Sequence, residues 1–352
     1  MSVRSSTFEE RTCFIRSLED MKVATGKVHE NLAQVPELEA LKAALANILV
    51  ANGCSAESFE IISRQPGVYT STFPTEILRC KFGDGTERQI FCKYHIKDLR
   101  KLNYGDHGGI AYEAAIYREI LQHAQVSTPG FVGVHSDDHT RQVWLFLEYL
   151  EESEHVHKVD IQNGLLSAAR WLGKFHAENE QRASSNEYSF LIRFDAEYYT
   201  GWIARTLEMT ASYQDRFVWL PNVCNEFTKS IELLLSEPLT VIHGGFYPRN
   251  ILVSNGKVYP VDWESVAIAA GEIDVATLTE GWRSDVAQEC EYVYQSARWP
   301  DGSPDVFPQR MKLARMYMEF RWLGDRPQWT RNEGPWRIES MGRLAKALGF
   351  LS

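Results

Sequence analysis

One amide and two acids follow each other at fixed spacing in the segment from Val241 to Glu264, VIHGGFYPRNILVSNGKVYPVDWE. Asn250 comes seven residues after His243, Asp262 comes twelve residues after Asn250, and Glu264 stands two residues beyond. Amide and carboxylate oxygens are hard ligands that suit Mg²⁺ bridging the β- and γ-phosphates of a nucleotide. We therefore expect Asn250 and Asp262 to be metal ligands, with Glu264 joining them or holding a water.

The apolar runs ILV and VYPV predict two short strands on either side of the turn SNGK. Such a hairpin would bring Asn250 and Asp262 close together in space. Each of these residues alone could be an ordinary turn or surface residue, but their joint spacing around two apolar strands argues against coincidence.

Phosphoryl transfer from ATP also needs a lysine on the phosphates and a group that holds this lysine. Lys93 lies late in a predicted strand, on the face opposite to Ile90 and Cys92. Glu113 lies early in the next predicted helix, so a Lys93–Glu113 ion pair is expected. The alternative for Lys93 is a solvated residue near a strand end, and Glu119 is expected to face solvent.

The other parts of a nucleotide site are less clearly marked. The segment RQPGVYTSTF contains a single glycine, Gly67, and lacks the G-x-G-x-x-G pattern, although residues 70–72 offer hydroxyls and amides. An ordinary hairpin loop explains this segment equally well. The backbone of Glu148 to Leu150 is expected to present N–H and C=O groups to an adenine edge, because it lies between the two predicted lobes.

The elements that must position these residues change in character along the chain. A helix is predicted over residues 36–53, whose buried face contains Leu38, Leu41, Leu45, Ile48 and Leu49. Strands are predicted at 57–63, 76–82, 88–94, 130–136 and 143–150, and a helix at 109–124. Beyond residue 152 the pattern is mainly helical.

This order predicts an α+β fold with two lobes. We expect a helical extension over residues 1–55, a β-rich nucleotide-binding N-lobe over 56–150, and a helical C-lobe over 151–352 that carries the catalytic and metal-binding segment. A chain of 352 residues is too long for one ordinary core.

Composition narrows the class of protein. The chain is 44% hydrophobic and 24% charged, which is normal for a globular protein, and its net charge of −10 argues against nucleic-acid binding. No apolar run is long enough for a membrane span or a signal peptide, so we expect a cytoplasmic protein that does not bind membranes. The six scattered cysteines contain no C-x-x-C pair and predict reduced, mostly buried thiols.

HGGFYPRN and PVDWE together resemble the aminoglycoside phosphotransferase and choline kinase branch of the protein-kinase-like fold, which carries H-G-D-x-x-x-x-N followed by an I-D-[FW]-E-like segment. LGKFHAE, YEAAIYREIL and GEIDVATL resemble further elements of that family. The resemblance covers roughly residues 57 to 325. It implies a bilobal kinase-like fold, ATP and Mg²⁺ as cofactors, a small-molecule substrate, a supporting role for His243, and a bracing role for Asp274.

Gly245 departs from the family, whose acid at this position accepts or orients the proton of the substrate hydroxyl. Three interpretations remain open: a working kinase in which the substrate or Glu264 replaces the base, a pseudokinase that binds a nucleotide or metabolite, and an active kinase with a point change at Gly245. Trp282 and Asp285 are candidates for acceptor binding. The acceptor, the choice between ATP and GTP, and the oligomeric state stay open.

His176, Trp322, Trp329 and Arg321 each allow a structural interpretation and a functional one. His176 lies on an amphipathic helix, where a packed and hydrogen-bonded histidine is expected rather than a base. Trp322 and Trp329, with Arg321 and the other arginines near them, are expected to pack the helical lobe rather than to line a substrate pocket.

Overall fold

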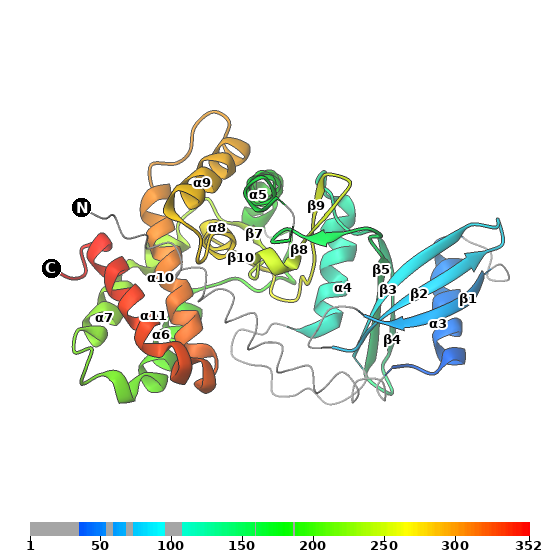
Figure 1. The fold of residues 1–352 in the computed structure, drawn as a ribbon, viewed down its shortest axis with the longest axis horizontal. Helices are drawn as coiled ribbons and strands as arrows, with labels where there is room; N and C mark the ends of the chain where they lie inside the picture. Colours follow the sequence, from blue (N-terminus) through cyan, green and yellow to red (C-terminus); the bar gives the residue numbers. More distant parts are fainter. Residues whose placement is uncertain (1–34, 54–58, 68–72, 96–107, 159, 186) are drawn as a thin grey trace, which may run out of the picture. The chain divides into compact units, whose positions relative to one another are not determined.

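The computed structural model describes residues 35–53, 59–67, 73–95, 108–158, 160–185 and 187–352 (Figure 1). The chain divides into two compact units. The first unit comprises Met1–Asp98 and Gly130–Tyr149, and the second comprises Leu99–Pro129 and Leu150–Ser352.

A five-stranded antiparallel sheet forms the first unit, with the strand order β1-β2-β3-β5-β4. Its strands are β1 (Phe59–Pro66), β2 (Thr75–Phe82), β3 (Glu87–His95), β4 (Phe131–Asp137) and β5 (Gln142–Glu148). Both predicted hairpins are present, one between β2 and β3 and one between β4 and β5. The first two residues predicted for β1, 57 and 58, lie outside the described residues, and the other strands begin within one residue of the expected positions.

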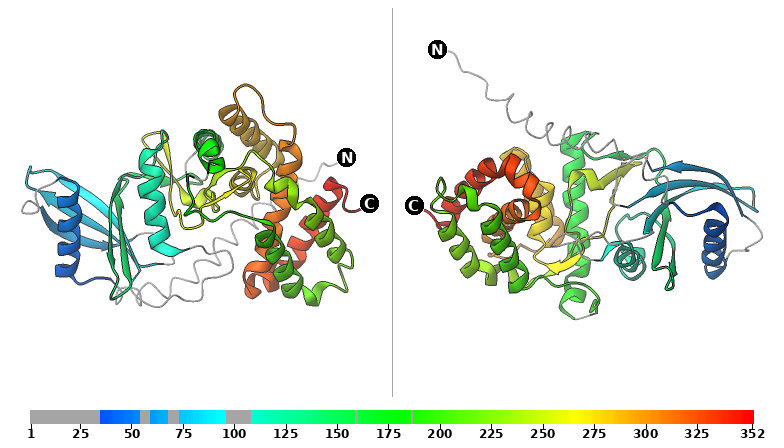
Figure 2. Two further views of the ribbon diagram at one scale, coloured as in Figure 1. Left: turned by 180° about the vertical axis from the view of Figure 1, so that it is seen from behind. Right: turned by 90° about the horizontal axis from the view of Figure 1, so that it is seen from below.

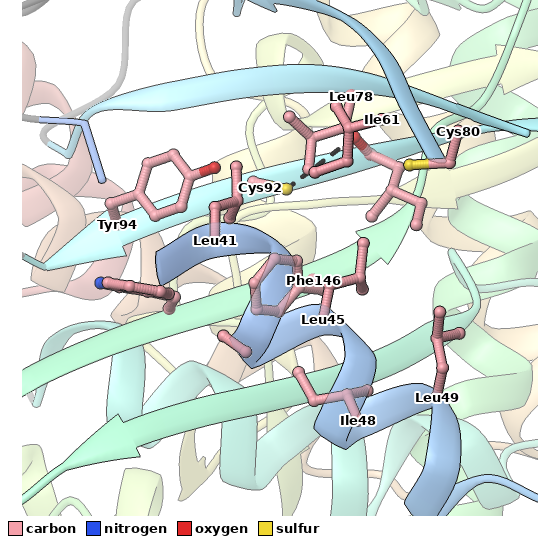
Figure 3. Packing of buried hydrophobic residues seen from close by; sticks show 13 residues of the cluster. Leu41, Leu45, Ile48, Leu49, Ile61, Leu78, Cys80, Cys92, Tyr94 and Phe146 are labelled. Atoms are coloured by element: carbon pink, nitrogen blue, oxygen red, sulfur yellow. Dashed lines mark hydrogen bonds between the residues drawn. The ribbon is translucent and has the colours of Figure 1, made fainter. Parts of the chain in front are cut away.

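Helix α3 (Leu38–Ala51) packs along one face of this sheet, as the two views of Figure 2 show. Leu41 and Leu45 of α3 meet Cys92 and Phe146 of the sheet in a shared apolar core (Figure 3). Each fully buried leucine contributes about 1.5–3 kcal/mol through apolar burial. Leu38 was predicted to share this face, but it lies in the first turn and is 38% exposed.

The second unit is mainly helical. Its larger elements are α4 (Gly109–Glu119), α5 (Ile161–Ser184), α6 (Ala196–Met209), α7 (Leu220–Leu235), α8 (Glu272–Leu278), α9 (Ser284–Arg298), α10 (Phe307–Asp325) and α11 (Pro327–Leu348), with the short 3₁₀ helices η4 (Leu121–His123) and η5 (Ala211–Tyr213). α10 packs against α6, α7, α8 and α11 and is buried on most of its sides (Figure 1). α5 packs along α9.

Two small sheets lie within this helical unit. β7 (Thr240–Ile242) pairs antiparallel with β10 (Ala267–Ala269). β6 (Glu154–His155), β8 (Ile251–Ser254) and β9 (Lys257–Pro260) form a three-stranded antiparallel sheet. The predicted α+β class is confirmed: the five longest strands come first, and most helices follow.

The described cysteines agree with the predicted reduced state. Cys80, Cys92, Cys224 and Cys290 are buried and form no disulfide, and burial raises the pKa of the Cys80 thiol to about 11. In the described ranges, no helix combines the length and apolar character needed to cross a membrane.

Candidate active site

The loop HGGFYPRN begins where the buried strand β7 ends. The 3₁₀ helix η6 (Pro248–Asn250) completes the loop, and the β8–β9 hairpin follows directly. Val241, Ile242 and Phe246 are fully buried, so the apolar residues of this segment anchor the loop in the core of the second unit. The polar residues between them are consequently held in fixed positions.

Asp274 of α8 fixes the start of this loop. Its Oδ2 accepts a hydrogen bond from the backbone N–H of His243 at 2.6 Å, and its Oδ1 accepts one from the N–H of Gly244 at 2.9 Å. Asp274 is fully buried, so both amides would lose their partner if the carboxylate were removed. The predicted bracing role of Asp274 is confirmed.

A buried chain of polar groups extends from Asp274 into the helices. His176 of α5 lies 3.3 Å from Asp274 through Nε2 and 2.9 Å from the Tyr294 hydroxyl through Nδ1, and Arg298 donates to that hydroxyl at 2.6 Å. Burial lowers the pKa of His176 to about 4, so the ring is neutral near pH 7 and donates from Nε2 to Asp274. The expectation of a packed, hydrogen-bonded histidine is confirmed.

His243 also has a structural role. Its Nε2 donates to the carbonyl of Val261 at 3.1 Å, and its Nδ1 accepts from the N–H of Gly245 at 3.3 Å. Both bonds require the neutral ring, and burial lowers the pKa of His243 accordingly. His243 therefore links the loop to the segment that carries Asp262, as its expected supporting role requires.

Gly244 can only be glycine. Its φ is +73°, and a Cβ atom added there would lie 2.1 Å from the carbonyl oxygen of Ser265. The neighbouring Gly245 has no such constraint. A Cβ atom on Gly245 would lie 3.8 Å from Asn250 Nδ2 and 3.8 Å from His243 Nδ1, which are ordinary van der Waals distances.

Asn250 and Asp262 stand at the two ends of the predicted hairpin. The N–H of Val261 donates to the carbonyl of Asn250 at 2.8 Å, which extends the β8–β9 ladder by one step beyond the pair of Ile251 and Pro260. The structure thus brings the backbones of the two candidate ligands together. Glu264 lies two residues further, in the turn after Asp262, and is partly exposed.

The orientation of Asn250 suits a metal ligand. Its Nδ2 donates to the carbonyl of Gly245 at 3.0 Å, which leaves the Oδ1 oxygen to act as an acceptor or a metal ligand. Asp262 has a φ of +69°, a conformation that aspartate tolerates better than most side chains. An amide oxygen and a carboxylate fit Mg²⁺, which usually keeps waters and takes few protein ligands.

Glu113 has a partner that its sequence position did not indicate. Its Oε1 accepts from the N–H of Trp263 at 3.2 Å, so it supports the residue that follows Asp262. Lys93 is 3% exposed, which excludes the solvated alternative. Lys93 belongs to the first unit and Glu113 to the second, and their ion pair stays a prediction.

Of residues 148–150, which are expected at the adenine edge, two already use their backbone N–H groups in other backbone hydrogen bonds. The N–H of Glu148 donates to the carbonyl of Gly130 at 2.8 Å, and the N–H of Tyr149 donates to that of Gln89 at 3.2 Å. Within the described ranges, Leu150 is thus the residue of this segment whose amide has no backbone acceptor. Residues 70–72, expected to cover the phosphates, lie outside the described residues.

A comparison with models of known protein families assigns the chain to one of them. The model described as APH, phosphotransferase enzyme family, matches residues 93–301, which is more than half of the chain. The chain belongs to this phosphotransferase family. No curated protein sequence matches it.

Solved structures that are similar to this phosphotransferase share its fold. Choline kinase LicA from Streptococcus pneumoniae is 15% identical, with a TM-score of 0.54 over 89% of this chain and 99% of that chain. Choline kinase from Cryptosporidium parvum Iowa II is 9% identical, with a TM-score of 0.57 over 90% and 98%. The GDP complex of aminoglycoside 2'-phosphotransferase-IIIa is 10% identical, with a TM-score of 0.53 over 87% and 97%. The predicted kinase-like fold is confirmed.

The two candidates for acceptor binding in this phosphotransferase lie just after α8. Trp282 is partly buried, and its N–H donates to the carbonyl of Thr279 at 3.3 Å. Asp285 is exposed in the first turn of α9 and pairs with Arg283 at 2.5 Å. A role for either residue in acceptor binding stays a prediction.

A row of aromatic rings and arginines adjoins the loop. The Tyr247 and Trp322 ring centroids lie 6.2 Å apart, and those of Trp322 and Trp329 lie 5.0 Å apart. The Arg249 guanidinium lies 4.4 Å from the centre of the Tyr247 ring. The sequence favoured packing for the tryptophans, and their ring contacts agree, but the row also reaches the catalytic loop.

Arg321 of α10 reaches the loop itself, which the sequence did not predict. Its Nη1 donates to the carbonyl oxygen of Gly244, the group bonded to the nitrogen of Gly245. These residues are 77 positions apart in the chain, so no local pattern could show the contact. The alternation of arginine and tryptophan over residues 321–337 was the available signal.

Proposed function

We propose that this phosphotransferase transfers the γ-phosphoryl group of ATP to a hydroxyl group of a small molecule. Antibiotic, choline-like and sugar-like alcohols are the acceptor classes to test first. The observation that supports this most is the retained scaffold. Asp274 holds the amides of His243 and Gly244, and the ladder bond at Val261 keeps Asn250 beside the segment that carries Asp262.

Each retained residue has a defined task in this proposal. Asn250 and Asp262 would hold the metal, with Glu264 as a third ligand or as the residue that holds a water. Magnesium, when bound, would neutralise charge on the β- and γ-phosphates. Lys93, oriented by Glu113, would bind the phosphates.

The nucleotide would lie against the β-rich lobe, residues 56–150. The backbone at Glu148 and Leu150 would meet the adenine edge there. Residues 151–352 would form the C-lobe with the catalytic and metal-binding segment, and residues 1–55 would be an N-terminal extension. Within the first unit, α3 of this extension packs on the five-stranded sheet.

The missing acid at Gly245 lowers the expected rate without removing the activity. General base catalysis typically contributes 10²- to 10⁴-fold, or roughly 3–5.5 kcal/mol of barrier. Most of the acceleration of phosphoryl transfer comes instead from positioning and from neutralisation of charge. Asn250, Asp262 and Lys93 would still supply those contributions.

A catalytically inactive pseudokinase is the second candidate, and Gly245 is the observation that favours it. Such a protein would bind a nucleotide or a metabolite without transferring phosphate. Both candidates predict saturable Mg-ATP binding, so turnover distinguishes them.

The test compares wild type with Gly245→Asp and Gly245→Glu on Mg-ATP and a panel of neutral small alcohols, with GTP as the comparison nucleotide. We expect measurable product with wild type and a faster rate with the acidic variants, because a Cβ at this position meets no closer contact than 3.8 Å. Turnover in neither form, with Mg-ATP binding retained, would support the pseudokinase.

A second variant tests the metal site. Asp262→Asn keeps a side chain that tolerates positive φ but removes the charge, so the fold is expected to persist. A ligand at about 100-fold its Kd stabilises a protein by about 2.7 kcal/mol, and we expect Asp262→Asn to lose this magnesium-dependent gain with ATP. Asp285→Asn, on the exposed turn of α9, is the matched control and should keep it. An unchanged response in Asp262→Asn would contradict the metal role.

A further inference from the structure

Arg321, which is partly exposed, differs in its partners from the buried arginines of the second unit. Arg310 pairs with Glu272 at 3.1 Å, Arg298 with Glu180 at 2.8 Å, and Arg337 with Glu280 at 2.6 Å. In the part of the chain that the structure describes, Arg321 has no carboxylate within ion-pair distance, and its hydrogen-bond partner is the carbonyl of Gly244. Three buried arginines thus have a carboxylate partner, whereas the partly exposed Arg321 at the catalytic loop has none among the described residues.

The surroundings of Arg321 keep its charge in place. Burial lowers the pKa of Arg321, whereas Tyr247, Tyr317, Tyr198 and the carboxylate of Asp325 raise it above its ordinary value. Asp325 forms its described ion pair with Arg326, at 3.7 Å. An arginine remains charged even where it is removed from bulk water. A cation in such a position favours binding of an anion that enters from outside.

The loop also has room for an additional group at Gly245. A Cβ atom there would meet only Asn250 Nδ2 and His243 Nδ1 within 4 Å, so a small acidic group can be accommodated beside the loop. Arg321 contacts the carbonyl that precedes this residue. Gly245 itself is buried, but Asn250, Tyr247 and Arg321 are partly exposed, so the loop meets solvent at these three side chains.

The geometry points to a hydroxy acid as the acceptor, with its carboxylate bound to Arg321 and placed beside Gly245 where the loop lacks an acid. This inference rests on the proposed phosphotransferase function and names its substrate class. The hydroxyl oxygen attacks the γ-phosphorus of ATP and its proton passes to the neighbouring carboxylate of the substrate. The bond from the γ-phosphorus to the bridging oxygen breaks, ADP leaves, a phosphate ester forms, and the acid later loses the proton to water.

The test uses glycerate and 3-phenyllactate, each against its primary amide, which keeps the hydroxyl and the shape but removes the charge. 3-Phenyllactate also probes the aromatic row at Tyr247, Trp322 and Trp329. For wild type we expect kcat/KM to favour the acids by about 10- to 100-fold, the range of one charge-assisted pair. Arg321→Gln should reduce this preference to within about threefold by slowing the acids alone.

Two further variants sharpen the result. Gly245→Asp places a second carboxylate beside that of the substrate, so we expect it to slow the acids and to accelerate the amides. Arg343→Gln removes an exposed arginine of α11 and should leave the preference of wild type unchanged. Equal kcat/KM for acid and amide in wild type would overturn the inference. So would an equal loss on both in Arg321→Gln, because that result would assign Arg321 to the transferred phosphate.

A binding measurement separates this inference from the proposed function. Glycerate or 3-phenyllactate should raise the melting temperature of wild type saturably, whereas the amides and Arg321→Gln with either acid should show no rise. Absence of acid binding overturns the hydroxy-acid inference even where neutral alcohols are phosphorylated. Acid binding through Arg321 without phosphoryl transfer by wild type or Gly245→Asp overturns the proposed function and keeps the site.

Discussion

Two adjacent glycines of the loop meet opposite surroundings. Gly244 has a φ of +73°, its N–H is held by Asp274, and a Cβ there would overlap the Ser265 carbonyl at 2.1 Å. Gly245 has room for a side chain, with its closest neighbours at 3.8 Å. The loop therefore requires glycine at position 244, where Asp274 holds it, and has room for a side chain at position 245. Loss of the acid at Gly245 is therefore a change of chemistry that the scaffold accommodates without rearrangement.

Substitution of Asp274, which holds the start of the loop, should have the largest effect on stability. Asp274→Ala leaves the buried amides of His243 and Gly244 without acceptors, at about 1–3 kcal/mol each, and also removes the partner of His176. We expect a loss of about 3–5 kcal/mol in the free energy of unfolding, measured by urea denaturation. Asp285→Asn, an exposed acid, is the control, and a loss below about 1 kcal/mol in Asp274→Ala would refute the bracing role.

Gly244→Ala should have the second-largest effect on the free energy of unfolding. The substitution adds the cost of a positive φ for a residue with a Cβ to a steric overlap with backbone, together about 3 kcal/mol. The same denaturation experiment measures it. A variant as stable as wild type would mean that the loop can adopt another conformation at this position, and the contrast with Gly245 would disappear.

The pH dependence of stability tests the buried polar groups next to Asp274, in particular His176. The pKa of His176 is lowered from 6.5 to about 4, so the unfolded state binds the proton more tightly than the folded state. The stability from the neutral ring is fully present above pH 6.5 and is lost as the pH falls toward 4, by roughly 3 kcal/mol at 1.36 kcal/mol per pKa unit. His176→Gln should remove this part of the acid sensitivity and leave the parts due to His155 and His243, whose pKa values burial also lowers. An unchanged pH profile would contradict the buried, neutral His176.

Local sequence patterns predict the elements whose apolar residues recur at a regular spacing or are bounded by turn residues. The β2–β3 and β8–β9 hairpins follow from alternating apolar residues around GDG and SNGK, and the family resemblance extended this to the brace at Asp274. Leu38 shows the limit of periodicity, because a helical stripe does not reveal where the sheet that covers it ends.

The rest of the site depends on contacts between residues distant in the chain. Arg321 reaches Gly244 across 77 positions, and Glu113 reaches the Trp263 amide across 150. No spacing rule predicts either, because each depends on how helices pack in the second unit. That Arg321 has no ion-pair partner among the described residues likewise follows only from the positions of the carboxylates in the fold.

The smallest effect should come from Gly245→Ala. Its φ lies outside the left-handed region and its Cβ would lie 3.8 Å from the nearest atoms, so the native conformation accepts alanine. Replacing glycine at such a site stabilises a protein by about 0.4–1 kcal/mol, because the unfolded chain loses freedom. We expect a free energy of unfolding equal to wild type or higher by up to about 1 kcal/mol, in contrast to Gly244→Ala. A destabilised Gly245→Ala would show that the space beside this residue is closed, which would remove the room that both an acid at this position and the carboxylate of a hydroxy acid require.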